Sequence, residues 1–449
     1  MKKVFFLLTL LPYLVGFTQE LQTPRCIFDS LIQEAYKSED FRILMYHEEQ
    51  DFQDILKNKS SLSENSSIPV VIHIVKNTND TDMNITDEMV YRQLEILNET
   101  YNQNNTDVEI TPEFFEPLIG NVGFEFCLAT VDPLGYSTTG ITRTYTDVSV
   151  FSTVSNNIKY ASEGGVDAWD TDSYLNIWVG KLSSSILGYS HIPSTSVPDQ
   201  EHGVVINYPF FGETNHSFYN MGKTLVHEIG HYFNLKHPWG NGNCDQNNDW
   251  VDDTPTSESA YAGSPVHPQT SCETVDMFMN FMDYVYDSSM VMFSIGQAER
   301  MQTALQYLRP GLLESNGCGI PSLIAKPAIL HASEVNANDA SIELNIVSGI
   351  PPFTILWESG EETNYLADIA TGSYSVTITD SIGQELILDL VVSHYGLVYD
   401  SDNFESYNSD SLLDDQSDDW FAFCLDTFSA NISSVSAPEG LQYLEINSI

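Results

Sequence analysis

Apolar positions in the middle of the chain recur with the spacing of buried strands and amphipathic helices. The run IPVVIHIV at 68–75 is rich in β-branched residues, which predicts a buried strand. The segment 85–103 spaces its apolar residues helically, and Thr86 or Asp87 can cap its start. Further strands are predicted at 122–130, 174–182 and 202–210, and a last helix at 296–308 that stops at the breakers Pro310-Gly311. This order predicts an α/β (α+β) domain with a mixed sheet over residues 63–318.

The pattern changes after Cys318. Residues 325–395 contain no long helical pattern and show short alternating runs divided by turn residues. Such a pattern is typical of a small all-β sandwich. Residues 396–449 are short for a domain of their own, and we interpret them as a partial or truncated C-terminal β module.

The N-terminal residues have the pattern of an export signal. In MKKVFFLLTLLPYLVGFTQE, two lysines precede an apolar run that gives way to small and polar residues, so we assign residues 1–18 to a signal peptide. Residues 19–62 are polar and helix-favouring, and we interpret them as a pro-segment. No later stretch has the length of a membrane-spanning helix, so we expect a secreted protein, extracellular or at the cell surface.

Composition narrows the classes of partner. The chain has 17 Lys and Arg against 63 Asp and Glu, and its formal net charge is -46, which disfavours nucleic acid. The acidic surface serves solubility or attracts calcium or basic peptides. Export permits disulfides, although spacing alone does not show which cysteines pair. The six cysteines are Cys26, Cys127, Cys244, Cys272, Cys318 and Cys424.

The chemistry concentrates in the stretch HEIGHYFNLKHPWG at 227–240. An HExxH pattern on a helix places His227 and His231 one turn apart, so that two imidazole nitrogens can bind one Zn²⁺. Glu228 then lies beside the metal and can take a proton from a zinc-bound water. The alternative is a helix with two surface histidines, because five residues alone form a weak motif.

His237 makes the motif more specific. On a continuing helix it would lie roughly 120° away from His231, so it can face the metal only if the helix ends between them. Asn234 stands at the required bend, and Asn is the non-glycine residue that best tolerates the left-handed conformation. We therefore expect Asn234 to stop the helix and His237 to supply a third ligand.

HEIGHYFNLKH resembles the extended zinc motif of the metzincin metallopeptidases, with Asn in place of Gly. The stretches GKTLVHEIGHYFNLKHPWG and DMFMNFMDYVYD are similar to the pappalysin/cytophagalysin branch, and the resemblance covers roughly residues 60–318. It implies that His227, His231 and His237 bind zinc and that Glu228 is the general base. It also implies that Met282 forms the Met-turn below the metal and that Tyr284 stabilises the oxyanion of the tetrahedral intermediate.

The sequence departs from this family in the substrate pocket. The family carries an acidic residue four positions after the tyrosine, which favours arginine, whereas this chain has Ser288 there. Asp287 is a possible substitute. The resemblance also implies a disulfide between Cys244 and Cys272.

Two further sites follow from the same resemblance. The family binds calcium near the acidic loop 243–255, where Asp249, Asp252 and the carbonyl of Thr254 are candidate ligands; a solvated acidic loop is the alternative. Cys26, in PRC at 24–26, resembles a pro-segment cysteine that keeps the enzyme latent by binding zinc as thiolate. A disulfide or a free thiol is the alternative.

Two functions from different classes remain open. The first is a secreted zinc endopeptidase that hydrolyses proteins or peptides with zinc-activated water and Glu228 as base. The second is a non-catalytic surface adhesin or polymer-binding protein, because residues 325–395 resemble the SprB-type Ig-like repeats of bacterial adhesins, which would contact surface polymer or other proteins. Glu228 separates the two functions, since a binding protein has no use for the base.

Overall fold

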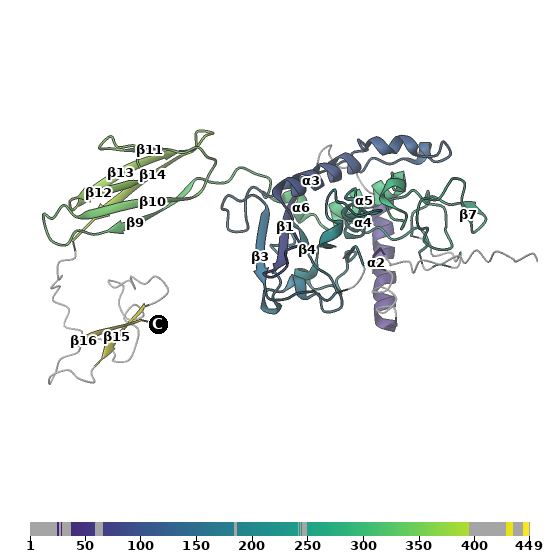
Figure 1. The fold of residues 1–449 in the computed structure, drawn as a ribbon, viewed down its shortest axis with the longest axis horizontal. Helices are drawn as coiled ribbons and strands as arrows, with labels where there is room; N and C mark the ends of the chain where they lie inside the picture. Colours follow the sequence, from purple (N-terminus) through teal and green to yellow (C-terminus); the bar gives the residue numbers. More distant parts are fainter. Residues whose placement is uncertain are drawn as a thin grey trace, which may run out of the picture. The chain divides into compact units, whose positions relative to one another are not determined.

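The structure is a computed structural model that describes residues 25–26, 28, 37–58, 66–183, 186–240, 242, 244, 249–394, 428–433 and 443–448. The expected signal peptide, Cys424 and most of 396–449 lie outside the described residues. The chain divides into two compact units, the first mainly Met1–Ile324 and the second formed by most of the remainder. Figure 1 labels the elements of both units.

A six-stranded mixed sheet organises the first unit, in the order β2-β1-β4-β6-β5 with β3 also paired to β1. Only β5 is antiparallel to its neighbour. Strand β1 is long, so β2 and β3 pair with successive halves of one of its edges while β4 pairs with the other edge. The strands are β1 (Ser66–Asn77), β2 (Phe124–Leu128), β3 (Ile141–Thr146), β4 (Leu175–Gly180), β5 (Gly188–Ser190) and β6 (Val204–Asn207).

The helices of this unit begin where the sequence supplies caps. Thr86 caps α3 (Asp87–Tyr101) by accepting a hydrogen bond from the Met89 N–H. Ser294 and Gln297 form a capping box at the start of α5 (Ile295–Tyr307). The helix predicted at 296–308 is confirmed as α5, which ends at Tyr307, before Pro310. Pro310 is also the N-cap of a short helix that was not predicted, α6 (Gly311–Glu314). Proline is tolerated there because the first N–H groups of a helix have no intrahelical partner.

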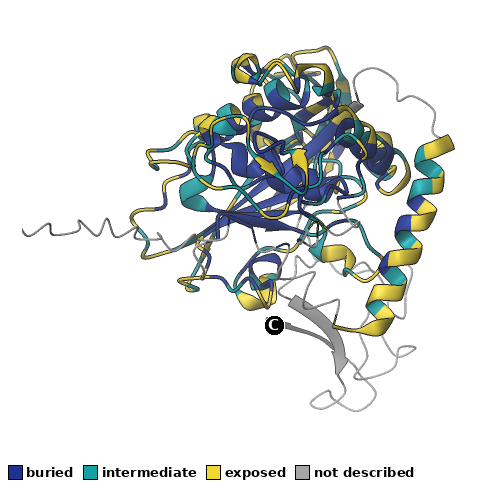
Figure 2. Cartoon of the chain, turned by 90° about the vertical axis from the view of Figure 1, so that its right-hand side faces the viewer, coloured by how far each residue is buried: buried dark blue, intermediate teal, exposed yellow. Residues whose placement is uncertain are grey.

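The core lies between the sheet and these helices. Helix α4 (Lys223–Tyr232) packs against β5 and β6, and α3 packs against β2 and α4. Side chains of β1, such as Ile68 and Val70, are fully buried with Leu225 and Ile229 of α4 in one cluster. Figure 2 shows this buried centre in dark blue, surrounded by more exposed loops.

One helix from the predicted pro-segment packs on this unit. Helix α2 (Glu39–Asn58) contacts α5, and it buries Met45, Glu49 and Phe52 while most of its other residues stay partly or fully exposed. The helix agrees with the helix-favouring sequence of this segment. Its buried residues were not expected, because the segment was predicted to lie outside the core. Among the described helices, none combines the length and apolar character needed to cross a membrane.

Two disulfides brace the first unit. Cys127 on β2 is joined to Cys318, and Cys244 is joined to Cys272, the pair that the resemblance implies. The partner of Cys127 could not be deduced from spacing, because 191 residues separate it from Cys318.

The second unit contains the predicted β-sandwich strands. They form two three-stranded sheets, β12-β10-β9 and β11-β13-β14. Trp357 is buried here, and its indole N–H donates to the Thr363 carbonyl. The strands are β9 (Ile324–Leu330), β10 (Ala340–Ser348), β11 (Thr354–Trp357), β12 (Tyr365–Ile369), β13 (Gly372–Thr379) and β14 (Glu385–Val392). Two short hairpins complete the described strands: β7 (Thr270–Ser271) with β8 (Thr274–Val275), and β15 (Phe428–Ser433) with β16 (Tyr443–Ser448).

Candidate metal centre

Helix α4 carries the first two predicted ligands in its buried interior. All ten of its residues are buried, because the helix is covered by the sheet on one side and by the segment around Met282 on another. His227 and His231 lie one turn apart, with ring centroids 4.9 Å from each other. They are therefore not surface histidines.

The helix ends as Asn234 predicts. Asn234 has φ 73°, in the left-handed region. Its N–H donates to the His231 carbonyl at 2.9 Å, and the Leu235 N–H donates to the Gly230 carbonyl at 2.9 Å. These two bonds are the pattern of a Schellman helix end, which reverses the chain just past His231.

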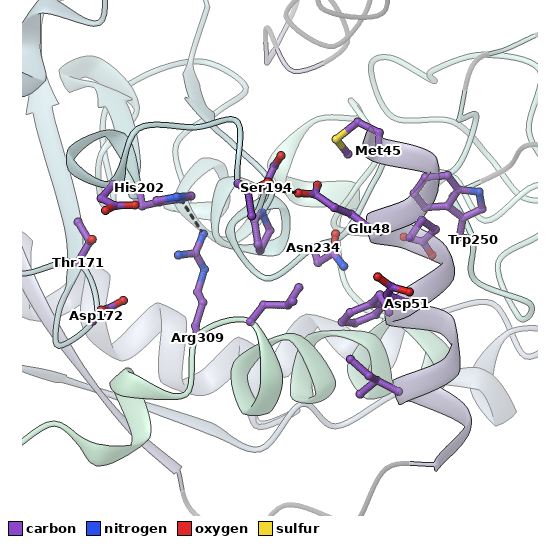
Figure 3. Close-up of a pocket in the computed structure, with 17 residues that line it drawn as sticks. Met45, Glu48, Asp51, Thr171, Asp172, Ser194, His202, Asn234, Trp250 and Arg309 are labelled. Atoms are coloured by element: carbon purple, nitrogen blue, oxygen red, sulfur yellow. Dashed lines mark hydrogen bonds between the residues drawn. The ribbon is translucent and has the colours of Figure 1, made fainter. Parts of the chain in front are cut away.

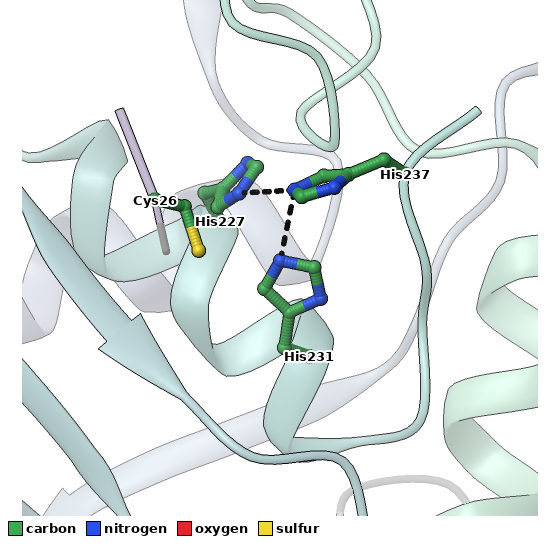
Figure 4. A group of neighbouring side chains, drawn as sticks. All are labelled: Cys26, His227, His231 and His237. Carbon is green, nitrogen blue, oxygen red and sulfur yellow. Dashed lines mark hydrogen bonds between the residues drawn. The ribbon is translucent and has the colours of Figure 1, made fainter. Parts of the chain in front are cut away.

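The reversal brings His237 back to the other two histidines (Figure 4). Its Nε2 lies 3.1 Å from the Nε2 of His231 and 3.3 Å from that of His227. The Nδ1 atoms of His227 and His231 lie 2.8 Å from the carbonyl oxygens of Phe281 and Leu235. Donation of Nδ1–H to these carbonyls leaves a lone pair on each Nε2, directed at the same point.

This donor set fits a metal ion. Four-coordinate zinc with bonds of about 2.0–2.1 Å holds its nitrogen ligands about 3.3 Å apart, which matches the spacing of the rings. Burial, together with the neighbouring His231 and His237, lowers the pKa of His227 well below its ordinary value, so this ring stays neutral. Neutral imidazoles with converging lone pairs at this spacing are what a tripodal metal site requires.

Met282 lies directly below the ligand helix. It is fully buried, and a Cβ added at Gly230 would come within 2.4 Å of its sulfur. The absence of a side chain at Gly230 therefore lets Met282 pack directly against α4. The preceding residue, Phe281, supplies the carbonyl that orients His227, so this turn places a ligand as well as filling space.

Glu228 is fully buried beside the three rings. Its Oε2 accepts a hydrogen bond from Cys26 Sγ at 3.4 Å, while its Oε1 has no hydrogen-bond partner among the described residues. Burial raises the pKa of Glu228 to about 8, against smaller opposing effects from Cys26 and Arg25. Edge strand β5 approaches closely, because Gly188 has no side chain and an added Cβ would lie 3.1 Å from Glu228 Cγ.

Cys26 lies across the same centre. Its Sγ and the ligand nitrogens of the three histidines all fall within 4.8 Å of one another (Figure 4). Cys26 forms a parallel bridge with Gly188 of β5, and the neighbouring Leu187 N–H donates to the Arg25 carbonyl at 3.0 Å. Phe28 stacks on His231 with centroids 4.1 Å apart. Residues 25, 26 and 28 thus cover the metal centre along edge strand β5.

Tyr284 contacts the N-terminal segment at Cys26. Its hydroxyl donates to the Cys26 carbonyl at 3.3 Å. Its ring lies 4.9 Å from those of His237 and Trp239 and 5.8 Å from that of His227. The phenol can therefore donate to a peptide carbonyl that lies beside the metal centre.

Arg25 fills an acidic pocket next to Cys26. Its Nη2 donates to Asp287 Oδ1 at 3.1 Å, and its Nη1 donates to the Val285 carbonyl at 2.9 Å. The guanidinium also lies over the Tyr219 ring, 5.1 Å from its centroid. Arg25 and Asp287 are both about 1% exposed, whereas Ser288 is exposed.

A short network holds Asp287 in place. Its Oδ2 accepts the Met221 N–H at 2.8 Å. Lys223, the first residue of α4, donates from Nζ to the carbonyls of Asp287 at 2.9 Å and Met290 at 2.7 Å, and it is paired with Asp107. The contacts of Arg25 and Lys223 were not predicted, because their partners Asp287 and Asp107 are distant in the chain.

The acidic loop has a mixed arrangement. Asp249 is fully buried and accepts hydrogen bonds from the Thr254 hydroxyl, at 2.8 and 2.7 Å, and from the Val251 N–H at 3.2 Å. Asp252 is exposed, and Asp253 instead accepts from Ser294 and Gly296. Burial raises the pKa of Asp249 to about 7. The structure thus brings Asp249 and Thr254 together but leaves Asp252 in solvent.

A helix with two histidines and a glutamate, ending in a turn that returns a third histidine, defines a metallopeptidase of the HExxH type. The chain belongs to the peptidase M43 family (pregnancy-associated plasma protein-A), whose model matches residues 159–306, and it is a metalloendopeptidase. It is 30% identical over 256 residues to an extracellular metalloprotease of Arthroderma gypseum, which covers 55% of this chain and 75% of that protein.

Solved structures show the same fold. A promirolysin mutant of Tannerella forsythia is 36% identical with a TM-score of 0.60, covering 67% of this chain and 100% of that one. Mature mirolysin of the same organism, in complex with a cleaved peptide, is 38% identical with a TM-score of 0.54, covering 58% of this chain and 100% of that one. The predicted mixed α/β class is thereby confirmed for the metallopeptidase domain.

Proposed function

We propose that this chain is a secreted, zinc-dependent endopeptidase, made as a precursor whose N-terminal segment covers its own active site. The observation that carries the proposal is the convergence of three buried Nε2 atoms, 3.1 and 3.3 Å apart, beside a buried carboxylate. His227, His231 and His237 would hold the zinc, which when bound polarises a peptide carbonyl and lowers the pKa of a water molecule.

Glu228 is proposed as the general base. It would accept a proton from the attacking water and return it to the leaving amine. Its full burial and the open Oε1 support this role, because a structural carboxylate in the interior is normally hydrogen-bonded at both oxygens. A non-catalytic adhesin would have no reason to keep this carboxylate desolvated.

Tyr284 is proposed to stabilise negative charge on the scissile carbonyl oxygen. Its hydroxyl already donates to a peptide carbonyl, that of Cys26, next to the three rings. The same donation to a substrate would strengthen as the oxygen becomes an oxyanion. Met282 would serve as the apolar floor that supports His227 through Phe281.

The pocket of Asp287 is proposed to select arginine on the substrate. Arg25 occupies it with a buried ion pair and a carbonyl contact, which is the recognition that a substrate arginine would need. Asp287 would then replace the acidic residue expected at Ser288.

The same segment is proposed to keep the precursor latent. Cys26 Sγ lies within reach of the three histidines, so its thiolate would fill the remaining metal position. Residues 19–62 would be the pro-segment, 63–318 the peptidase domain and 325–395 an SprB-type spacing module. Calcium binding at Asp249 and Thr254 remains a further proposal, supported by their proximity.

The test uses the processed protein and its Glu228→Ala variant. We expect casein cleavage to fall by at least about a hundredfold in the variant, the lower range for loss of a general base, while bound zinc stays near one per chain. A chelator should abolish cleavage by the parent, and added zinc should restore it. Glu258→Ala, at an exposed glutamate, is the control. Undiminished cleavage by Glu228→Ala would remove the proposed mechanism.

A further inference from the structure

A second ion pair joins the pro-segment to the peptidase domain at a distance from the metal centre. Glu49 on α2 accepts two parallel hydrogen bonds from Arg300 on α5, with Nη1–Oε1 2.8 Å and Nη2–Oε2 2.6 Å. The side chain of Arg300 is 0% exposed and that of Glu49 is 6% exposed. Two parallel N–H···O bonds are the geometry in which arginine recognises a carboxylate most specifically.

Residues of the peptidase domain contact Arg300 as well, while α2 adds the Phe52 ring, 4.8 Å from the guanidinium. Its Nε donates to the Asn234 carbonyl at 2.7 Å, on the turn that returns His237 to the metal centre. Its guanidinium lies 5.6 Å from the Trp250 ring, and the Lys236 ammonium lies 3.0 Å from the same ring. The domain thus binds Nε through the Asn234 carbonyl and leaves both Nη atoms directed at Glu49 of α2.

No other carboxylate hydrogen-bonds the Nη atoms of Arg300 among the described residues. Asp249 is close enough to affect this arginine electrostatically, but its oxygens accept bonds from Thr254 and the Val251 N–H. Loss of α2 would remove this carboxylate and expose both Nη atoms to solvent. The carboxylate of a ligand could then form the same two parallel bonds.

A cavity of about 390 Å³ lies beside this ion pair, on the side of Glu49. It is lined by Met45 and Glu49 of α2 and by Ser194, Asn234 and Trp250 of the domain (Figure 3). Met45 packs in one cluster with Cys26, Phe28 and Ile192. Helix α2 thus covers surface that continues directly from the metal centre.

We propose that Arg300 forms a carboxylate-binding subsite of the substrate cleft. Glu49 fills it in the precursor, and an acidic group of the peptide substrate fills it once the pro-segment has left. This inference rests on the proposed function, since it requires a cleft that α2 vacates. It assigns the enzyme a preference at a position separate from the Asp287 pocket, where the opposite charge is recognised.

The first experiment measures cleavage by the processed protein, verified by mass spectrometry to lack residues 39–58. Matched peptides carry Glu or Gln at each position on either side of one cleaved bond, and each is made with a free and an amidated C-terminus. At one position, or at the free C-terminus, we expect the acidic form to raise kcat/KM about tenfold, the factor for one charge-assisted hydrogen bond. In Arg300→Gln this ratio should fall to about one, and in Arg300→Lys, which keeps the charge but loses the fork, to an intermediate value.

The second experiment uses the full-length chain and needs no activity. In Glu49→Gly, sodium acetate should raise the melting temperature above that in sodium chloride of equal ionic strength. The double variant Glu49→Gly/Arg300→Gln should show no such difference, and neither should Glu48→Gly, which alters a neighbouring glutamate of α2.

The outcomes separate the two proposals. Peptides that are cut equally with Glu and Gln at every position, and with either C-terminus, would overturn the subsite while leaving the peptidase intact. If no peptide is cut at all, the proposed function fails, and the acetate experiment then decides whether Arg300 binds a carboxylate.

Discussion

At the scale of single residues, the contact of Arg25 with Asp287 supports the proposed preference for arginine. An arginine of the pro-segment is buried against a carboxylate next to the metal centre, and a carbonyl and a tyrosine ring complete its surroundings. Because Cys26 follows Arg25 directly, this arginine is one residue away from the side chain that lies against the three histidines. We therefore propose that an arginine of the substrate binds where Arg25 binds in the precursor.

Asp287→Asn should reduce the preference for arginine. The change removes the negative charge but keeps the size of the side chain, so we expect the ratio of kcat/KM for arginine over leucine beside the scissile bond to fall at least about tenfold. Cleavage of matched peptides by the processed protein measures this ratio. Ser288→Ala is the matched control, since Ser288 is exposed, and a loss of preference in that variant instead would return the role to Ser288.

At the scale of elements, the end of α4 decides whether a third ligand exists. Asn234 adopts φ 73° and its neighbours close the Schellman pattern, so the helix stops within one turn of His231. The Arg300 N–H bond to the Asn234 carbonyl fixes the same turn from α5. The metal site thus depends on one left-handed residue.

Asn234→Gly and Asn234→Ala should differ for this reason. Glycine adopts the left-handed region freely, so we expect its variant to stay within about 0.5 kcal/mol of the parent in unfolding free energy, whereas alanine should cost about 1 kcal/mol. Zinc affinity should weaken with alanine only. Denaturant unfolding and zinc titration measure both quantities, and equal behaviour of the two variants would show that the turn is not strained.

A buried lysine at the end of the 3-10 helix Asn157–Lys159, packed on side chains of β4 and β5, forms a second element-scale feature. Lys159 is fully buried, donates from Nζ to the Glu201 carbonyl at 2.5 Å, and lies over the rings of Trp178 and Tyr189 at 5.1 and 5.4 Å. Burial lowers its pKa from 10.5 to about 7. The lysine therefore loses its proton on folding over a range of pH in which the unfolded chain keeps it.

Lys159→Met should remove a pH dependence of stability. Between about pH 7 and 10.5 the unfolded parent binds one more proton than the folded parent, so the parent gains up to about 1.4 kcal/mol per pH unit as pH rises. The difference in unfolding free energy between parent and variant should thus increase over this range and be flat below pH 7. Urea unfolding at several pH values measures this difference. If the unfolding free energies of parent and variant changed equally with pH, the lowered pKa of Lys159 would be contradicted.

At the scale of the whole molecule, the proposed pro-segment contacts the proposed substrate cleft at three points. Arg25 fills the acidic pocket, Cys26 reaches the metal ligands, and Glu49 binds Arg300. Each contact involves a buried group that the peptidase domain would otherwise leave without its partner. Latency is therefore proposed to rest on several contacts, of which only one involves the metal.

Cys26→Ala in the full-length chain should weaken latency. Without the thiol, the remaining metal position opens while Arg25 and α2 still hold the segment, so we expect partial cleavage of a peptide substrate before processing, above the parent precursor. The measurement is peptide cleavage by unprocessed protein, with Cys26→Ser as a second variant. If the parent and Cys26→Ala precursors were equally inactive, latency would depend on the contacts of Arg25 and Glu49 instead.

The sequence predicted those features that depend on near neighbours in the chain. The strand at 68–75, the caps at Thr86 and the turn at Asn234 follow from local periodicity and backbone preference. The ligands His227 and His231 follow from helical spacing, which fixes their separation whatever the rest of the fold does. The helix predicted at 296–308 ends before Pro310, as local preference indicates, whereas the short helix α6 that begins after this proline was not predicted.

What the tertiary structure decided lies between residues far apart in the sequence. The pairing of Cys127 with Cys318, the contact of Arg25 with Asp287 and that of Glu49 with Arg300 span 191, 262 and 251 residues. No periodicity or backbone preference acts over such separations, since these pairs form only when the sheet and helices bring their segments together. The sequence by itself therefore determined the candidate metal ligands, because they depend on local spacing, and the fold alone decided which distant side chains surround them.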